Sequence, residues 1–585
     1  MLPCPRPLCV NTARVVSSLL PALCGTALWL RLPLHESTPD GAPGADSTSS
    51  WCAWDAFRSA LGDNDPGSGC GAGGASASAP SLLGVILDVG PTLPDEAVWR
   101  IWLAEPLRAL CVCESAFTTN ARGFPVLPKA HQALLAAAFA AGVQVVLRPA
   151  PPPPPGAPRG LGDDDDGSNA SAAATAANGG APPPPPPHPM SRHWEYVAFL
   201  FSRLPPWDAR DTAEAGYRDF LQAPLQPLAD DLESATYDTF EKDAAKYEAY
   251  QDAVASAIRA LRPPPPAASS VPKIAPEPLV VFVLGAGRGP LVRAALSAAE
   301  QCCTPVRVYV VEKNPNALVH LAAVCAAEGW TQRGVVALCR GDMRSWAPPE
   351  RAHIAVSELL GSFGDNELSP ECLDGCARTL LLPCGICIPQ SYTSFLSPVV
   401  SSRLHDEVRS RAAAAGGGGG AAASFGSSGV GPAAWETPYV VKLHRVALLS
   451  PPQAVFTFTH PPAAAVVGSG GLDGGHSRSA VLLFRRAPSA PPARVHGLAG
   501  YFDAVLHGAV TLSTVPGRET PGLFSWFPIF FPLRSPLLVG RGAAVGVSMW
   551  RVVGPGRVWY EWCVTVPHQG AIHNVGGRSS FVGLG

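Results

Sequence analysis

Two glutamates on either side of a short turn are the side chains of this sequence best suited to do chemistry. They lie in the stretch SELLGSFGDNELSPE, residues 357–371, where Glu358 follows the apolar run HIAVS and Glu367 stands beyond the glycine-containing turn. A carboxylate beside the end of a hydrophobic strand costs free energy unless a cation lies next to it. The spacing therefore indicates two acids around a cationic ligand, and two solvated acids on a surface turn are the alternative.

A glycine-rich turn predicts a second site, for a cofactor. The continuous apolar run LVVFVL leads into Gly285 and Gly287, whose lack of a side chain permits a sharp turn and a close approach of the backbone to a ligand. The next strand, VRVYVVE, ends at Glu312, where an acid would bind ribose hydroxyls. A third strand, GVVALC, leads to Asp342 and Met343, which we expect at the amino group and the face of an adenine. The pattern predicts a site for an adenosine.

Two enzyme classes bind adenosine in this way, dehydrogenases with a Rossmann fold and methyltransferases that use S-adenosylmethionine. The dehydrogenase motif places its third glycine where Pro290 stands, and no phosphate-binding lysine follows the turn. These differences favour S-adenosylmethionine. A glycine-rich turn without a ligand is a third interpretation, which the suitable side chains at three strand ends disfavour.

A guanidinium group fits the pair of acids best if a methyl group is transferred. It carries five N–H donors in a planar fork and stays protonated at physiological pH. Two carboxylates can bind four of these donors and leave one terminal nitrogen free to face the methyl group. The same acids offset the repulsion between a cationic substrate and a sulfonium.

Composition excludes some other classes of function. The chain has 585 residues, 47% of them apolar, and a formal net charge of −3, which gives no general attraction to nucleic acid or to an anionic membrane. The 16 cysteines lack the two paired clusters of a zinc site, so we expect no metal and a reducing compartment. The apolar stretch 13–34 is interpreted as a helix followed by a buried strand, with a targeting peptide as the alternative.

Low-complexity tracts divide the chain into three blocks of regular pattern. These tracts cannot bury enough apolar surface to order themselves, so we interpret them as disordered inserts. They occupy residues 62–80, 149–189, 263–276, 411–434 and 461–479.

The three blocks differ in their predicted secondary structure. In the first, predicted strands at 27–34, 82–89, 108–113 and 143–147 alternate with helical stretches such as 129–142, which indicates a parallel sheet but not a complete eight-stranded barrel. The second block is again α/β. In the third, short apolar runs between Pro/Gly turns predict an antiparallel sandwich or barrel.

The motifs together resemble one family. SELLGSFGDNELSPECLDG resembles the double-glutamate loop of protein arginine N-methyltransferases, and LGAGRGPLV, VEKNPNA, GDMRSW, ATYDTFEKDAAKY, IPQSYTSFL, FSWFPIFFP and NVGGRSSFVGL resemble the type II members, which form monomethyl- and symmetric dimethylarginine. The resemblance covers most of 82–585 outside the inserts. It implies a partial TIM-like barrel over 1–222 that lacks its first half, with an insert at 149–189. A Rossmann-like methyltransferase domain over 235–388 and a C-terminal β-barrel over 389–585 follow, the latter with a dimerising segment and inserts at 411–434 and 461–479.

The resemblance also implies roles for individual residues. Glu358 and Glu367 would be catalytic. The cofactor would be bound by Tyr237, Lys246, Tyr247, Gly285, Gly287, Glu312, Asp342 and Met343. Phe240 would shape the acceptor pocket, Ser525 stands where asymmetric-dimethylating relatives have histidine, and Trp526 would line the arginine channel.

The family further implies partners and a location. Substrates would be histones, spliceosomal proteins and other Gly/Arg-rich proteins, in cytoplasm and nucleus, and a homo-oligomer and a WD-repeat partner are expected. Because the barrel is incomplete, a catalytically weak scaffold of the same family is the alternative function.

Overall fold

The computed structural model describes residues 12–17, 27–35, 48–63, 83–150, 188–262, 277–332, 335–416, 431–461 and 475–585. The five predicted inserts lie mostly outside the described residues. The chain forms two compact units, one made chiefly of residues up to Trp207 and the other of Asp208–Gly585. Among the described residues, no helix combines the length and the apolar character that crossing a bilayer requires.

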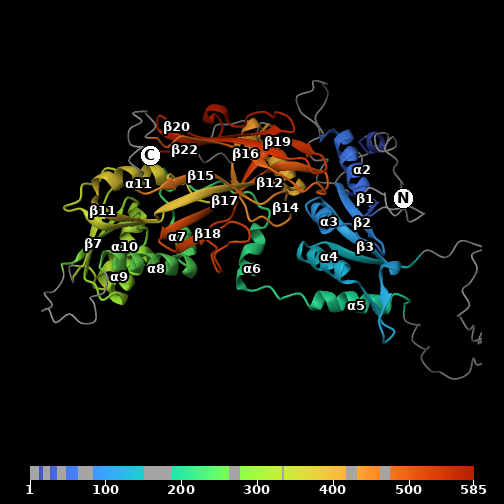
Figure 1. Ribbon diagram of the computed structural model, residues 1–585, viewed down its shortest axis with the longest axis horizontal. Coiled ribbons are helices and arrows are strands. Elements are labelled where there is room, and N and C mark those ends of the chain that lie inside the picture. The colour runs from blue at the N-terminus through green and yellow to red at the C-terminus, as the bar shows by residue number, and fades with distance from the viewer. Residues whose placement is uncertain are drawn as a thin grey trace, which may run out of the picture. The chain divides into compact units, whose positions relative to one another are not determined.

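The first unit contains a parallel sheet of four strands, drawn in blue in Figure 1. In spatial order the strands are β1 (Leu28–Pro33), β2 (Leu83–Val89), β3 (Leu107–Cys113) and β6 (Gln144–Arg148). The helices are α2 (Ser49–Arg58), α3 (Glu96–Leu103), α4 (Lys129–Ala140) and α5 (Ser191–Ser202), and a two-stranded ribbon joins β4 (Thr118–Thr119) to β5 (Pro125–Val126). All four predicted strands are present, and α4 ends just before Gly142, whose φ of 69° lets the chain reverse.

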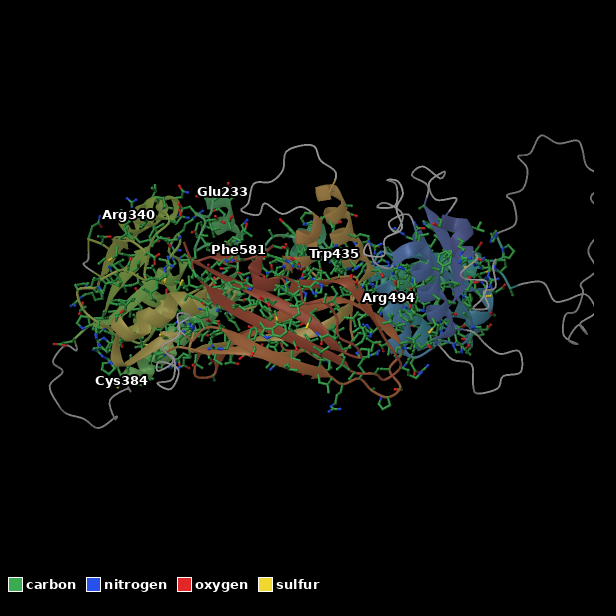
Figure 2. All side chains as sticks on the ribbon, turned by 90° about the horizontal axis from the view of Figure 1, so that it is seen from above. Glu233, Arg340, Cys384, Trp435, Arg494 and Phe581 are labelled. Atoms are coloured by element: carbon green, nitrogen blue, oxygen red, sulfur yellow. The ribbon has the colours of Figure 1, made fainter. Side chains whose placement is uncertain are left out.

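The second unit begins with an α/β half, built on a five-stranded parallel sheet. In spatial order the strands are β11 (Leu381–Ile388), β10 (Ala352–Ser357), β7 (Leu279–Leu284), β8 (Val306–Glu312) and β9 (Val336–Arg340). In Figure 2 the labels of Cys384 and Arg340 mark its two edges. The central strand β7 is buried along its whole length, as its continuous apolar sequence predicts.

The helices of this half are α6 (Ala209–Glu214), α7 (Ser234–Phe240), α8 (Ala244–Leu261), α9 (Pro290–Gln301), α10 (Pro315–Ala327) and α11 (Ser369–Thr379). Of these, α8, α9, α10 and α11 pack against strands of the sheet. Two of them begin at clear signals: α9 starts with Pro290 directly after the glycine loop, and the side chain of Asp243 caps α8 by accepting from the backbone N–H of Lys246.

The remainder of the second unit is antiparallel, as the sequence predicts. The first sheet contains β12 (Ser391–Val400), β13 (Tyr439–Val440), β14 (Ala447–Leu448), β15 (Gln453–Thr459), β17 (Ala493–His507), β18 (Val510–Ser513) and β19 (Ile529–Val539). The second contains β16 (Arg478–Phe484), β20 (Val545–Gly554), β21 (Arg557–Val566) and β22 (Val582–Gly583). Helix α12 (Ser402–Gly416) follows β12.

The two halves of the second unit share one hydrophobic core. Side chains of β7 and α8 belong to the same buried cluster as side chains of β12, β17 and β20. In Figure 1 the orange and red strands accordingly lie directly against the green and yellow α/β half. The loops after β7 and β10 are therefore held from both sides.

Candidate active site

The carboxyl ends of four neighbouring parallel strands meet at one cavity, which is the place where open α/β sheets bind ligands. Ten of the predicted site residues line it: Tyr237, Phe240, Tyr247, Gly285, Gly287, Glu312, Asp342, Met343, Glu358 and Glu367. The other three, Lys246, Ser525 and Trp526, are not in its wall. The structure thus brings together the predicted adenosine residues and the two predicted catalytic acids.

The glycine loop forms one wall in a conformation that other residues adopt at a cost. Gly285 and Gly287 have φ values of 70° and 54°. A Cβ atom on Gly287 would lie 2.9 Å from the ring of Tyr237, so a side chain there would also push that ring away. The close packing of Tyr237 on the loop therefore depends on glycine.

Glu312 closes the end of β8. Its Oε2 accepts from the backbone N–H of Gly287 at 2.7 Å, and its Oε1 accepts from that of Asn314 at 2.7 Å. Burial raises the pKa of this carboxyl, and the two N–H donors oppose that shift. Each carboxylate oxygen retains a further lone pair, so this pattern leaves room for hydroxyl donors such as those of a ribose.

Asp342 has a partner that the sequence interpretation did not include. Arg344 donates to both of its carboxylate oxygens, at 3.0 Å from Nε to Oδ1 and 2.6 Å from Nη2 to Oδ2, and holds the pKa of that carboxyl below its usual value. Arg344 also donates to the carbonyl of Leu584, near the end of the chain. The last residues of the second unit thus fix the orientation of one cavity-lining acid.

Lys246, predicted to bind the cofactor, forms an ion pair with the catalytic candidate Glu358. Its Nζ lies 3.1 Å from Oε2 of Glu358, and its side chain is 1% exposed. Three aromatic rings surround the ammonium, with ring centres 5.4 Å away for Phe240, 4.8 Å for Tyr247 and 5.1 Å for Trp526. Burial alone would lower the pKa of Lys246, but the charge and hydrogen bond of Glu358, together with Tyr247 and Asp243, outweigh burial and raise the pKa.

Glu367 has a different environment from Glu358. Burial, reinforced by the charge of Glu358, raises its pKa well above the ordinary value, and Lys246 opposes the shift only in part. The turn between the two glutamates is fixed by its own polar groups, since Oδ1 of Asn366 accepts from the backbone N–H of Phe363 at 2.7 Å. The two acids therefore share one cavity but differ in charge balance. Lys246 neutralises Glu358, whereas Glu367 has a raised pKa.

Ser525 and Trp526 belong to a loop that a buried carboxylate joins to α8. Oδ2 of Asp243, which is fully buried, accepts from the backbone N–H of Phe524 at 3.0 Å, from that of Ser525 at 2.8 Å and from its hydroxyl at 2.7 Å. The indole N–H of Trp526 donates to the carbonyl of Leu360 at 2.7 Å, on the turn between the glutamates. These bonds fix Trp526 relative to both the turn and α8.

The sequence interpretation missed several residues of this region. Arg288 lines the cavity and pairs with Glu241 at 3.1 Å and with Asp238, which ties α7 to the glycine loop. Asn314 donates to the hydroxyl of Tyr237 at 3.2 Å. Asp243 could have been found from its position before an amphipathic run, where aspartate is a favoured cap. Asn314 could have been found in the same way, as an asparagine cap directly before Pro315, whereas the sequence carries no comparable signal for Arg288. Among the described residues, no group of three or more His, Cys, Asp or Glu is arranged to hold a metal ion.

Comparison with known families covers almost the whole chain. Residues 1–203 match the PRMT5 TIM barrel domain, residues 208–388 the PRMT5 arginine-N-methyltransferase domain and residues 391–582 the PRMT5 oligomerisation domain. The predicted fold class, a TIM-type domain, a parallel-sheet methyltransferase domain and a C-terminal region rich in antiparallel strands, is confirmed.

Individual proteins give the same result. The chain is 42% identical to protein arginine N-methyltransferase 5 of Oryza sativa subsp. indica, over 100% of this chain and 82% of that protein. It is 37% identical to the Xenopus laevis protein of that name (96% of this chain, 77% of that protein) and 33% identical to protein arginine N-methyltransferase skb1 of Schizosaccharomyces pombe (97% and 79%).

Proposed function

The chain belongs to the protein arginine N-methyltransferase 5 family and is an arginine N-methyltransferase, and on this premise we propose that it forms monomethyl- and symmetric dimethylarginine in Gly/Arg-rich proteins. The observation that supports the proposal most directly is the presence of Glu358 and Glu367 in one cavity with the glycine loop. The alternative of a weak scaffold has less support, because the methyltransferase match spans residues 208–388, which include both glutamates and the glycine loop.

The charges of the site suit a guanidinium substrate. Lys246 and Glu358 form a neutral pair, and the raised pKa of Glu367 shows that a second negative charge is unfavourable there without a further cation. A substrate guanidinium supplies that cation, so the set of two acids, one lysine and one arginine becomes neutral. Glu358 and Glu367 would then bind the guanidinium N–H groups and leave one terminal nitrogen to attack.

The cofactor is S-adenosylmethionine, which supplies an electrophilic sulfonium methyl group when bound. The residues present fit it: the lone pairs left on Glu312 suit ribose hydroxyls, and the backbone at Gly285 and Gly287 allows a close approach. Met343 and Asp342 would contact the adenine, the carboxylate with Arg344 behind it. The chain itself orients and desolvates the reactants, since Lys246 and Glu358 already lie among aromatic rings.

The product is proposed to be symmetric because of the aromatic side of the site. Phe240 lines the cavity. The loop of Ser525 is bound by Asp243, and its Trp526 lies beside the ammonium of Lys246, as Phe240 does. A rigid ring at Phe240 would exclude a methyl group beside the attacking nitrogen, so a second methyl would go to the other terminal nitrogen.

A single product analysis tests the proposal. Purified full-length protein is incubated with labelled S-adenosylmethionine and a glycine-arginine-rich peptide, and the hydrolysed peptide is analysed for methylarginines. We expect monomethylarginine followed by symmetric dimethylarginine. Asymmetric dimethylarginine as the main product would refute the assignment of product type.

The proposal extends to partners and location. The match to an oligomerisation domain over residues 391–582 supports a homo-oligomer. Histones and spliceosomal proteins as substrates, a WD-repeat partner, and action in both cytoplasm and nucleus are proposed on the family relationship alone. Pull-down experiments test the binding of Gly/Arg-rich substrates, and size-exclusion chromatography with light scattering tests the homo-oligomer.

A further inference from the structure

A completely buried arginine lies next to the double-glutamate loop. Arg551 on β20 has a side chain that is 0% exposed, and it pairs with Asp365 through Nε at 2.5 Å. Its two terminal nitrogens donate to the two carboxylate oxygens of Glu371, each at 2.8 Å. One guanidinium from the C-terminal half thus binds two carboxylates of the methyltransferase half, where Figure 1 shows β20 and α11 as neighbours.

Asp365 is bound by further donors from the same half. Its Oδ2 accepts from the hydroxyl of Tyr560 at 2.6 Å, and its Oδ1 accepts from the hydroxyl of Ser394 at 2.9 Å. Strands β12, β20 and β21 therefore each supply one donor to this carboxylate. The loop cannot shift at Asp365 without breaking all three bonds.

The catalytic candidate Glu367 lies between the two anchored acids in sequence. Asp365 fixes the chain just before Glu367, and Glu371 fixes it in the first turn of α11. Arg551 binds both of these acids with one guanidinium. Its position is unusual for β20, because Val545, Val547 and Met549 on the same face of the strand are all fully buried apolar side chains.

A purely structural role accounts poorly for a charge at that position. A buried ion pair gains little stability over well-packed apolar side chains, because removing the charges from water offsets their attraction. What the network does provide is a single fixed arrangement of the loop. We propose that Arg551 is a positioning residue for Glu367, so that the region matched to the oligomerisation domain also builds the active site. This rests on the proposed role of Glu367.

The test separates loop geometry from folding. Arg551→Lys keeps the charge but loses the fork that binds Asp365 and Glu371 together. The matched control is Arg578→Lys, because Arg578 also binds both oxygens of a carboxylate, that of Glu436. Neither Arg551 nor Arg578 lines the cavity. For each protein, calorimetry with S-adenosylhomocysteine counts the folded, cofactor-binding sites. Fluorescence anisotropy then gives the affinity for a labelled glycine-arginine-rich peptide, and turnover is expressed per cofactor-binding site.

We expect Arg551→Lys to bind S-adenosylhomocysteine within about twofold of the wild type, and to bind the peptide at least about tenfold more weakly, with a comparable loss of turnover per site. Arg578→Lys should match the wild type in both. In a Glu367→Gln background, Arg551→Lys should weaken peptide binding no further, because its effect passes through Glu367. Wild-type peptide affinity of Arg551→Lys, or an equal loss in both backgrounds, overturns the proposal. A wild-type protein that fails to bind or methylate the peptide contradicts the proposed function instead.

A milder variant applies if Arg551→Lys does not fold. Tyr560→Phe removes only the hydroxyl that donates to Asp365 and leaves Arg551 in place. It should weaken peptide binding about threefold with unchanged binding of S-adenosylhomocysteine, which supports the positioning role. Unchanged peptide affinity in Tyr560→Phe overturns it.

Discussion

The two glutamates proposed to be catalytic should respond to the same chemical change with opposite effects on stability. Glu358→Gln and Glu367→Gln each remove one charge and keep the shape of the side chain, and both should lower turnover at least about tenfold because the guanidinium loses a charged partner. In the folded protein, however, Glu358 compensates Lys246 at 3.1 Å, whereas the pKa of Glu367 is raised well above its ordinary value. The charge of Glu358 therefore stabilises the folded protein, and the charge of Glu367 destabilises it.

The magnitudes follow from these environments. Glu358→Gln leaves the ammonium of Lys246, which is 1% exposed, without its counter-charge, and breaking a buried pair in this way costs about 3 kcal/mol. Glu367→Gln removes a charge that burial and Glu358 both disfavour. We therefore expect Glu367→Gln to stabilise the folded protein near neutral pH, opposite in sign to Glu358→Gln.

The pH dependence gives the sign an independent check. Because the carboxyl pKa of Glu367 is raised in the folded state, its contribution to stability is present below its unfolded-state pKa and is lost as the pH rises through the folded-state pKa. Glutamine does not titrate, so the advantage of Glu367→Gln should be small at about pH 5 and larger at about pH 8. Urea unfolding of the two variants and the wild type at both pH values measures this. The reasoning is refuted if Glu367→Gln is less stable than the wild type at the higher pH, or if Glu358→Gln costs nothing.

Three further predictions test other parts of the site. Glu312→Ala should weaken binding of S-adenosylhomocysteine by about 1–3 kcal/mol in titration calorimetry, because ribose hydroxyls lose their acceptor, and unchanged affinity would disprove the location of the ribose. Phe240→Met should give some asymmetric dimethylarginine beside the symmetric product, since methionine is more adaptable than a ring, and fragmentation mass spectrometry distinguishes the two. Asp243→Asn should lower the free energy of unfolding by about 2–3 kcal/mol, because its carboxylate accepts four hydrogen bonds. Ser525→Ala loses only one of these bonds and should cost about 1 kcal/mol. Equal losses in denaturant titrations would argue against a carboxylate shared by α8 and the loop.

The sequence predicts the α/β regions well because their signals are local. The apolar run of β7, the glycines after it and the acids at the ends of β8 and β10 each follow one another along the chain, and a parallel sheet brings such strand ends together at one edge. The position of Lys246 could not be predicted in this way. Phe240 and Tyr247 are near Lys246 in sequence, but its ion-pair partner Glu358 and the ring of Trp526 come from distant segments that meet Lys246 only in the folded protein.

Two central strands of the antiparallel region, β12 and β17, do not stand out in the sequence as short apolar runs between turns, and the reason is physical. β17 contains Gly497 and Gly500, and glycine usually weakens a strand. Here a Cβ on Gly497 would lie 2.3 Å from the ring of Phe530, and one on Gly500 would lie 2.5 Å from Ile529, so glycine permits neighbouring side chains to cross the strand. β12 carries Pro398 and was noticed only as a motif. Long-range packing, which no local pattern reports, decided both.

The bonds between Arg551 and the double-glutamate loop set an order of events during synthesis of the protein. Arg551 lies 180 residues after Glu371, so at 5–20 residues per second the ribosome adds it roughly 10–35 s later. Until then Asp365 and Glu371 lack the guanidinium that binds both of them, and β7 lacks the late strands that complete its core. A nascent chain can therefore carry its whole cofactor-binding motif outside the ribosome before its acceptor site is complete.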